Sequence, residues 1–400
     1  MILEGVRVLD FTQYLAGPTV TRLMAEMGAQ IIKIERAPGG DPSRGLPAIK
    51  HGRSGYFVQQ NLGKRSVCLD MDSPDTDLIV RDLVSKVDVV VENFGPGVME
   101  KRGWDYPSFR TINPSILMAS ISAFGRNSPL SHRTGFDLIA QAFAGVMAVT
   151  GPRGGSPHPV GMGMADVSSG VHAFASIGYA LYNREKTGRG QWMDISMIDC
   201  LFHMHEVNVQ APQVTDGAFR PGPLGSHHQL VCPCGVYKGP DGYLALLVLQ
   251  PQWKNLCRAM ARPELEFDQR FAEPAERAKR QQELIEMIEA WMAGFPNDVA
   301  LLDHLEQFRV PSGPVVNPAD AITHPYFVAR GTLRACQDRI LGQLMLPGFP
   351  LRFSDQTEYP ARSAPLLGEH NEVVLGDLLG YGQARIEALR AAKVIMSKPI

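Results

Sequence analysis

Residues 6–35, "VRVLDFTQYLAGPTVTRLMAEMGAQIIKIE", carry the pattern that decides the fold. Residues 6–11 predict a short buried strand, and residues 30–35 alternate in the way a second strand does. Residues 17–29 between them predict a helix, because a proline stands in the first turn and a glycine stands near the end. A strand, a helix and a strand within about 30 residues form a βαβ unit, whose two strands run parallel.

The same succession of strands and helices continues along the first half of the chain. A helix is predicted over 73–86, where a Ser-Pro pair marks its start, and a long helix is predicted from about 168 to 185. Further strands are predicted over 66–71, 87–94, 114–122 and 188–197. This order predicts an α/β domain built on a parallel sheet.

The chain changes character over residues 212–242, where proline and glycine are frequent and periodicity is weak. Beyond this region, strands are predicted over 242–249 and 312–317, and helices within 274–295 and over 297–308. The tail from about residue 333 has too little apolar periodicity for a third core. We therefore expect a large domain (1–210), a linker (211–226), a small domain (227–325) and a C-terminal segment that returns to the large domain (326–400).

Composition excludes several classes of function. The 400 residues carry a net charge of −2, which provides no basic field for nucleic acid. No segment reaches 18 consecutive apolar residues and the N-terminus lacks a signal-type apolar region, so we expect a cytoplasmic protein that does not span a membrane. The six cysteines are scattered, as free thiols are in a reducing compartment. "CPC" (232–234) and "HMHE" (203–206) lack zinc-site spacing, so we expect no metal.

The turns that follow the predicted strands indicate a ligand with phosphate groups. The turn after the first strand lacks G-x-G-x-x-G, which argues against a nicotinamide-dependent dehydrogenase. Arg36 stands beside Glu35 and suits a phosphate better than a ribose. "VENFGPG" (91–97) allows close backbone approach, and Lys101 and Arg102 could then meet a pyrophosphate. The alternative is a plain strand-to-helix turn with a solvated Lys-Arg pair.

Asp166 stands among small and apolar neighbours in "HPVGMGMADVSSG" (158–170), with no cation nearby in sequence. One interpretation is an N-cap for a helix that starts near Val167. The other is a carboxylate held for chemistry. Histidines in "SHHQL" (226–230) are surface residues in one interpretation and bind a substrate carboxylate in the other.

Many motifs agree in order and spacing with one family. They are "VRVLDFTQYLAGPTVTRLMAEMGAQIIKIER", "NLGKRSVCLDM", "VVVENFGPGVMEKRG", "SISAFG", "GFDLIAQAFAGVMAVTG", "GMGMADVSSGVHA", "KTGRGQWMDISMID" and "APLLGEHNEVV". In these motifs the chain resembles the family III CoA-transferases, a group that includes formyl-CoA transferase, carnitine CoA-transferase and the α-methylacyl-CoA racemases. The similarity covers essentially the whole chain and is densest over residues 4–200.

The resemblance implies an α/β fold with a Rossmann-like large domain, a smaller α/β domain, and two ring-like subunits that interlock as a homodimer. It implies that Asp166 is the catalytic aspartate. It also implies that coenzyme A and acyl-CoA are substrates, with no permanently bound cofactor. The positions that it assigns to CoA binding are Leu15, Ala16, Arg36, Leu69, Asp70, Met71, Asp72, Asn93, Phe94, Gly95, Lys101 and Arg102.

Two departures from the family pattern bear on the substrate. Racemases carry a Gly-His-Asp triplet where this chain has Gly135-Phe136-Asp137, and phenylalanine cannot exchange a proton. Formyl-CoA transferase has glutamine where this chain has Leu15, and its Gly-rich loop is replaced by "RPGPLGSHHQ" (220–229). The residues that we expect near the acid substrate are Phe136, Asp137, His227 and His228.

The leading hypothesis is a CoA-transferase that moves CoA from an acyl-CoA, such as succinyl-CoA, to a small carboxylic or dicarboxylic acid. The route passes through an aspartyl anhydride and an aspartyl-CoA thioester on Asp166. Gly161 and Gly163 would let a pantetheine chain approach closely. The alternatives are an acyl-CoA racemase or epimerase, and a non-catalytic CoA-binding protein.

Overall fold

The computed structural model describes residues 1–356 and 362–397. Residues 147–159, expected in the large domain, and 211–226, expected as a linker, group with a second unit. Residues 357–361 and 398–400 of the expected C-terminal segment lie outside the described residues. The chain forms two units: one holds 1–146, 160–210 and the residues from 325 onward, and the other holds 147–159 and 211–324.

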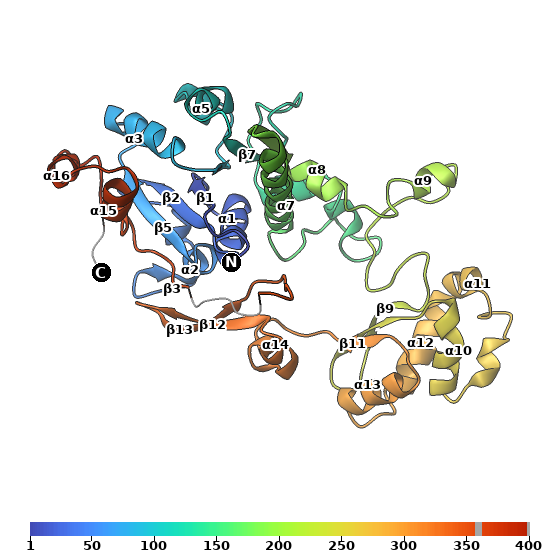
Figure 1. The fold of residues 1–400 in the computed structure, drawn as a ribbon. Helices are drawn as coiled ribbons and strands as arrows, with labels where there is room; N and C mark the ends of the chain where they lie inside the picture. Colours follow the sequence, from blue (N-terminus) through green and yellow to red (C-terminus); the bar gives the residue numbers. More distant parts are fainter. Residues whose placement is uncertain (357–361, 398–400) are drawn as a thin grey trace. The chain divides into compact units, whose positions relative to one another are not determined.

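A six-stranded parallel sheet forms the centre of the first unit, as the sequence predicted (Figure 1). The opening βαβ unit is confirmed as β1 (Arg7–Asp10), α1 (Ala16–Glu26) and β2 (Gln30–Arg36), with β1 and β2 parallel. The strand order is β5-β2-β1-β6-β7-β8. The other strands are β5 (Lys64–Leu69), β6 (Val89–Glu92), β7 (Leu117–Ser122) and β8 (Gln191–Ser196).

Helices cover both faces of this sheet, so its strands are apolar on both sides. Val8 and Ile31 belong to the core under α1 and α7, whereas their neighbours Leu9 and Ile32 belong to the core on the opposite face. The first unit contains α2 (Gly55–Gln60), α3 (Pro74–Val84), α4 (Val98–Lys101), α5 (Tyr106–Ile112), α6 (Asp137–Phe143), α7 (Met164–Thr187), α8 (Met197–Phe202), α14 (Pro325–Ala329), α15 (Asn371–Val373) and α16 (Gln383–Ala391).

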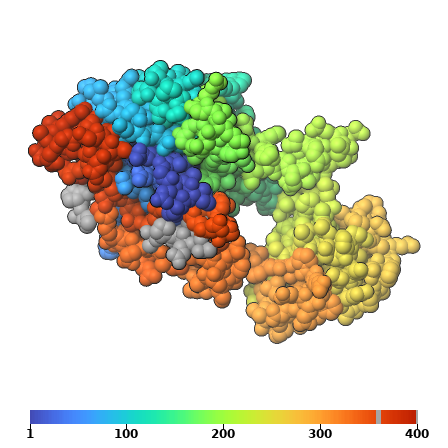
Figure 2. All heavy atoms as spheres, in the orientation of Figure 1, coloured from blue at the N-terminus to red at the C-terminus, as the bar shows by residue number. Residues whose placement is uncertain are grey.

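Within the first unit, Figure 2 shows C-terminal residues in orange and red beside N-terminal residues in blue. Arg53 is buried and donates to Asp338 at 2.8 Å and to the carbonyl oxygens of Ala364 and Pro365. Removing either partner of such a buried pair would leave an uncompensated charge, so the attachment is specific. Two short antiparallel sheets flank it: β3 (Ile49–Lys50) with β4 (Arg53–Ser54), and β12 (Leu333–Asp338) with β13 (Gly342–Pro347).

The second unit is an antiparallel three-stranded sheet with helices packed against it. Its core surrounds Trp253, and the fully buried Arg277 lies over that ring while donating to three backbone carbonyls. The helix predicted within 274–295 is two helices, since the chain breaks at Arg280. The elements are α9 (Ala211–Val214), β9 (Cys234–Lys238), β10 (Tyr243–Leu247), α10 (Gln250–Ala259), α11 (Pro274–Lys279), α12 (Gln281–Met292), α13 (Asp298–Gln307) and β11 (Ser312–Pro314).

Membrane insertion finds no support in the helices of residues 1–356 and 362–397. None of them combines the length and the apolar character that crossing a bilayer requires.

The order of the sheet reverses between β1 and β6. From β1 the chain proceeds to β2 and β5 on one side, and from β6 it proceeds to β7 and β8 on the other. In open α/β sheets the crevice at the carboxyl ends of the two central strands is where ligands bind. Here that crevice lies between the loop after β1 and the loop after β6.

Four buried charges hold the loop that follows β1. Lys33 pairs with Asp41 at 2.8 Å and also donates to the carbonyl of Thr12 at 2.6 Å. Lys64 pairs with Asp10 at 3.1 Å, and Asp10 accepts the N–H of Thr12 at 2.8 Å. Burial alone would raise the pKa of Asp10, but the two lysines outweigh it and keep that pKa below its usual value. The loop after β1 is therefore anchored by charges from three strands.

We predict that Lys33→Met lowers the free energy of unfolding by about 3–5 kcal/mol, because it leaves Asp41 buried without its cation. Urea unfolding followed by circular dichroism measures the change. Lys50→Met, on an exposed strand of the same unit, is the control and should leave the midpoint unchanged. Equal midpoints for the two variants would contradict the assigned role of Lys33.

Candidate active site

The two loops at the reversal of strand order are joined by one side chain. The Asn93 amide accepts the N–H of Gln13 at 2.8 Å and donates to the carbonyl of Gln13 at 2.9 Å. Both bonds involve backbone groups, so they fix the path of the loop and not only a side chain. Two of the segments predicted to contact CoA, at Leu15–Ala16 and at Asn93–Gly95, are therefore adjacent in the structure.

Asp166 lies in the first turn of α7, which begins at Met164 after the N-cap residue Gly163. The N-cap interpretation of Asp166 is therefore wrong, because the helix starts earlier than predicted. The carboxylate of Asp137, in the first turn of α6, instead accepts the N–H of Ala165 at 2.7 Å and that of Asp166 at 3.2 Å. Asp137 therefore caps the start of α7, and the Asp166 carboxyl group does not serve as the cap.

Asp166 is half-buried, and it forms no ion pair with any residue in the part of the chain that the structure describes. Burial raises the pKa of Asp166 to about 7, and the negative charge of Asp137 adds to the effect. Near neutral pH the carboxyl group therefore exists as both acid and carboxylate. A carboxylate with a raised pKa is a stronger nucleophile than a surface carboxylate, and such shifts are common at functional sites.

Glycine is required where α7 meets the loop after β1. A Cβ on Gly163 would lie 2.6 Å from the Leu15 side chain, and one on Gly170 would lie 2.7 Å from the carbonyl of Ala16. These contacts bring the start of α1 against the start of α7. A Cβ on Gly161 would meet nothing within 4 Å, so packing inside this chain leaves that position open.

Tyr56, on α2, is a site residue that the sequence analysis missed. Burial, together with the charges of Asp166, Asp41 and Asp137, raises the pKa of Tyr56 to about 12. The phenol therefore stays protonated and can donate a hydrogen bond beside Asp166. One tyrosine in a six-residue helix gives no sequence pattern that marks it as a site residue. Only the fold places Tyr56 near Asp166, which is distant in sequence.

The cations predicted to meet phosphate groups converge on one acid. Arg36 lies 3.5 Å from Asp72, and Arg102 lies 4.0 Å from the other oxygen of Asp72. Arg102 also donates to the carbonyl of Met71 at 2.6 Å and lies over the Trp104 ring. Arg36 and Asp72 are largely exposed and Arg102 is partly exposed, so an incoming phosphate can displace Asp72 at little cost.

The remaining residues predicted to bind CoA differ in what they can offer. Leu69 and Met71 have buried side chains, so only their backbone can meet a ligand. The Asp70 backbone is engaged by Val394 and its side chain by the N–H of Asp72. Lys101 is exposed at the end of α4.

Arg126 holds the loop that carries Asn93 and Phe94. Its guanidinium donates to both oxygens of the buried Glu92, at 3.0 and 2.9 Å, and to the carbonyl of Phe94 at 2.9 Å. Glu92 in turn accepts the N–H of Phe94 at 2.9 Å, and Asp194 accepts the N–H of Arg126. These charge-assisted hydrogen bonds fix the loop that carries Asn93 and Phe94.

The residues predicted to contact the acid substrate fall in both units. Phe136 is 69% exposed, and its ring meets that of Tyr14 edge-on at 6.2 Å. In the second unit, burial lowers the pKa of His227, and its ring lies 4.8 Å from that of Tyr237. His228 Nδ1 accepts the backbone N–H groups of Leu230 and Val231.

The cysteines and histidines form no metal centre in residues 1–356 and 362–397. No group of three or more His, Cys, Asp or Glu side chains is arranged there to hold a metal ion. All six cysteines are free, and five of them are buried, as the scattered spacing predicted.

Comparison with known proteins places this geometry in a class. Residues 3–371 match the family described as CoA-transferase family III, and the chain belongs to that family. It is thus an enzyme that uses acyl-CoA substrates. Over 96% of its length it is 36% identical to the succinyl-CoA:mesaconate CoA-transferase of Haloarcula hispanica, of which it covers 99%.

Two further relatives extend the comparison. The chain is 34% identical to the formyl-CoA:oxalate CoA-transferase of Streptomyces avermitilis, covering 98% of this chain and 99% of that one. The crystal structure of a CaiB/BaiF family protein from Brucella suis is 32% identical and superposes with a TM-score of 0.81, over 94% of this chain and 99% of that one. The α/β fold is thus that of the CaiB/BaiF proteins.

We predict that Asp166→Asn stabilises the protein at pH 8 but not at pH 4. A raised folded-state pKa means that the parent binds its proton more tightly when folded, so its stability falls as pH rises from about 4 to about 7. The variant lacks this penalty and should gain about 1–3 kcal/mol above pH 7, after allowance for partial exposure. Urea unfolding at several pH values measures the difference. A gain that is the same at pH 4 and pH 8 would contradict the shifted pKa.

Proposed function

We propose that the chain transfers CoA from an acyl-CoA to a small carboxylic or dicarboxylic acid, with Asp166 as the nucleophile. The observation that carries this proposal is a half-buried carboxyl group without a cation, at the start of α7 and against the loop after β1. Relatives whose names specify succinyl-CoA with mesaconate or glutarate as partners support a dicarboxylate as one of the substrates.

The first half of the reaction loads Asp166. A carboxylate oxygen attacks the thioester carbonyl carbon, the C–S bond breaks, and CoA leaves as a thiolate. Asp166 and the donor acid are then joined as a mixed anhydride. The thiolate attacks the Asp166 carbonyl carbon, the anhydride C–O bond breaks, and the donor acid leaves as a carboxylate. Asp166 is left as a CoA thioester, which is covalent catalysis by a carboxylate.

The second half repeats these steps with the acceptor. Its carboxylate attacks the aspartyl thioester, forms a second anhydride and releases the thiolate. The thiolate then attacks the acceptor carbonyl carbon, which yields the new acyl-CoA and restores the Asp166 carboxylate. No net proton is consumed. The Tyr56 hydroxyl can donate to a developing oxyanion, because its raised pKa keeps it protonated.

The positions assigned to CoA binding support this route. Arg36 and Arg102 present cations for phosphate groups at the same edge of the sheet as the Asn93 loop. Phe136 stands where an acyl-CoA racemase would need a proton-exchanging residue, so racemisation has less support.

Asp166→Ala should lower the rate of CoA transfer by roughly 10³-fold or more, because the covalent route is lost. CoA binding should persist, since the cations and loops assigned to it are untouched. CoA exchange between thioesters and acids is followed by mass spectrometry, and calorimetry measures CoA binding. Hydroxylamine added with acyl-CoA should leave a hydroxamate on the peptide that contains Asp166. Glu185→Ala, exposed near the end of the same helix, is the matched control. Transfer by Asp166→Ala at the parent rate would exclude the mechanism.

We also propose that the chain forms the homodimer that its family resemblance implies. α6, α7 and α8 pack together, yet their outer sides expose large apolar side chains. These include Leu138 at 55%, Phe143 at 56%, Tyr179 at 77% and Phe202 at 50% exposure. Patches of this kind mark protein–protein contacts. Light scattering after size exclusion should give twice the chain mass of 43.9 kDa. A single-chain mass at all concentrations would contradict the dimer.

A further inference from the structure

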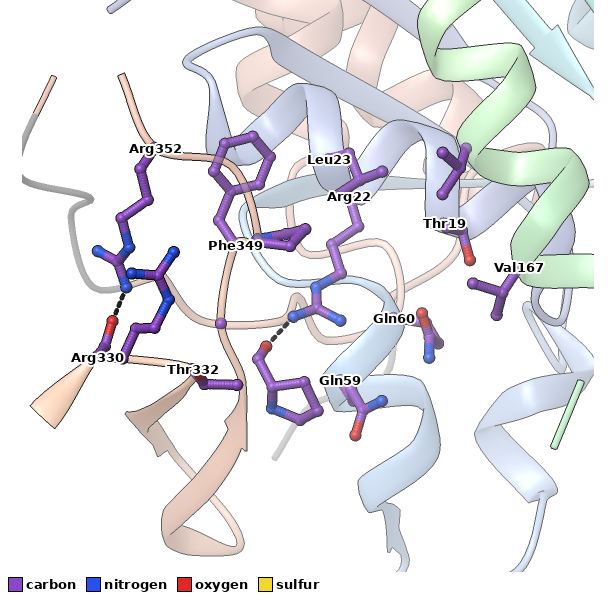
Figure 3. A pocket seen from close by; sticks show the side chains of 14 residues that line it. Thr19, Arg22, Leu23, Gln59, Gln60, Val167, Arg330, Thr332, Phe349 and Arg352 are labelled. Carbon is purple, nitrogen blue, oxygen red and sulfur yellow. Dashed lines mark hydrogen bonds between the residues drawn. The ribbon is translucent and has the colours of Figure 1, made fainter. Parts of the chain in front are cut away.

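A second space lies beside the candidate active site in the first unit. A pocket of about 430 Å³ opens between α1, α2, α7 and the C-terminal segment that includes Phe349 (Figure 3). Its lining is mostly apolar, with arginine and glutamine side chains interspersed among valine, leucine, proline and phenylalanine. Among the described residues, the pocket lining includes no aspartate or glutamate. The lining residues that bear on its ligand are Arg22, Gln60, Val167, Val171, Arg330 and Arg352.

Three elements contribute both to the candidate active site and to this pocket. On α7, Val167 directly follows Asp166, and Val171 lies one turn further on the same face. On α2, Gln60 lies one turn beyond Tyr56. On α1, Thr19 lies one turn beyond Leu15, whose carbonyl it bonds at 2.8 Å. Each of these pocket residues thus lies within about one turn, along its own helix, of a residue of the candidate active site.

The charge inside the pocket is positive and incompletely compensated. Arg22 donates to the carbonyl of Pro347, while its Nε is buried with no partner in the described residues. Burial lowers the pKa of Arg22, although Glu26 opposes this. Glu26 is itself paired with Arg334 at 2.6 Å. The Arg22 side chain lines the pocket, so an anion placed there could accept a charge-assisted bond from its guanidinium group.

The remaining polar groups point to a carboxylate as that anion. Gln60 is only 7% exposed, and its side-chain amide lines the pocket without a hydrogen-bond partner among the described residues. Arg330 and Arg352 stand at the outer side, where Arg352 donates to the Arg330 carbonyl (Figure 3). Guanidinium and amide donors suit a planar carboxylate, and the side chains of Val167 and Val171 suit methylene groups.

We propose that this pocket binds the distal carboxylate of a dicarboxylic acid whose other carboxyl group reacts at Asp166. This inference rests on the proposed function and narrows its substrate class. Arg22 and Gln60 hold the far carboxylate, and the apolar lining faces the chain between the two ends. A monocarboxylic acid of equal length leaves Arg22 without its anion, so the site discriminates against it.

The test compares glutarate with valerate, which differ only in the second carboxylate. In a double-displacement reaction, kcat/KM for the acceptor does not depend on the donor, so succinyl-CoA serves for both. Arg22→Met should lower kcat/KM for glutarate roughly 10- to 100-fold, as loss of a charged hydrogen bond does. The value for valerate should change far less.

Two further variants separate loss of the ligand contact from a structural effect of Arg22→Met. Arg22 also holds Pro347, so Arg22→Met could disturb the C-terminal segment. Gln60→Leu leaves that contact in place and should reduce kcat/KM for glutarate several-fold, again with little effect on valerate. Arg110→Met, an exposed arginine on α5, is the charge-matched control and should affect neither acid. Circular dichroism confirms that each variant is folded.

The outcomes separate this inference from the proposed function. Equal losses for both acids in Arg22→Met and Gln60→Leu, or no loss in either, would overturn the inference while leaving CoA transfer intact. If the parent transfers CoA to neither acid, calorimetry of glutarate decides. Binding that Arg22→Met abolishes would support the pocket although the transfer proposal fails for these acids, and absence of binding would overturn the pocket.

Discussion

The first unit depends on four charges buried beneath one loop. Lys33, Lys64 and Asp10 project from neighbouring strands, and Asp41 completes the set. Burying such charges is costly unless each has its partner and its hydrogen bonds. The backbone of Thr12 supplies those remaining bonds, so the loop after β1 can adopt few other paths. The four paired charges thus hold the loop after β1 rigidly at the edge of the sheet where a ligand can bind.

Further contacts, several of them to backbone groups, connect this rigid loop to the start of α7, where Asp166 lies. The Asn93 amide fastens the loop after β1 to the loop after β6, and Arg126 fastens the second loop in turn. Leu15 then packs against the position of Gly163, at the start of α7. Asp137 takes the capping bonds of that helix. The Asp166 carboxyl group is thus held in place, and burial together with the charge of Asp137 raises its pKa to about 7.

In the described part of the candidate site, the arginine side chains and the Asp166 carboxyl group do not pair with one another. Cations gather at Arg36 and Arg102, where phosphate groups would be neutralised, and at Arg22, on the other side of the α1–α7 contact. Asp166 itself lies near the carboxylate of Asp137 and the protonated Tyr56. In the proposed reaction, a carboxylate paired with a cation would be less basic and therefore a weaker nucleophile.

The sequence by itself determined the parallel sheet with its six strands, the helices α1, α3 and α7 in outline, and the choice of Asp166 as the residue to question. Those features follow from local periodicity and from turn residues, which act over a few positions. The early start of α7, the break at Arg280 and the grouping of residues 147–159 with the second unit were not foreseen. Only the tertiary structure brought Tyr56 and Asp137 to Asp166 and placed Arg22 beside Gln60. Side chains this far apart in the chain leave no periodic trace, because their meeting is decided by how the helices pack on the sheet.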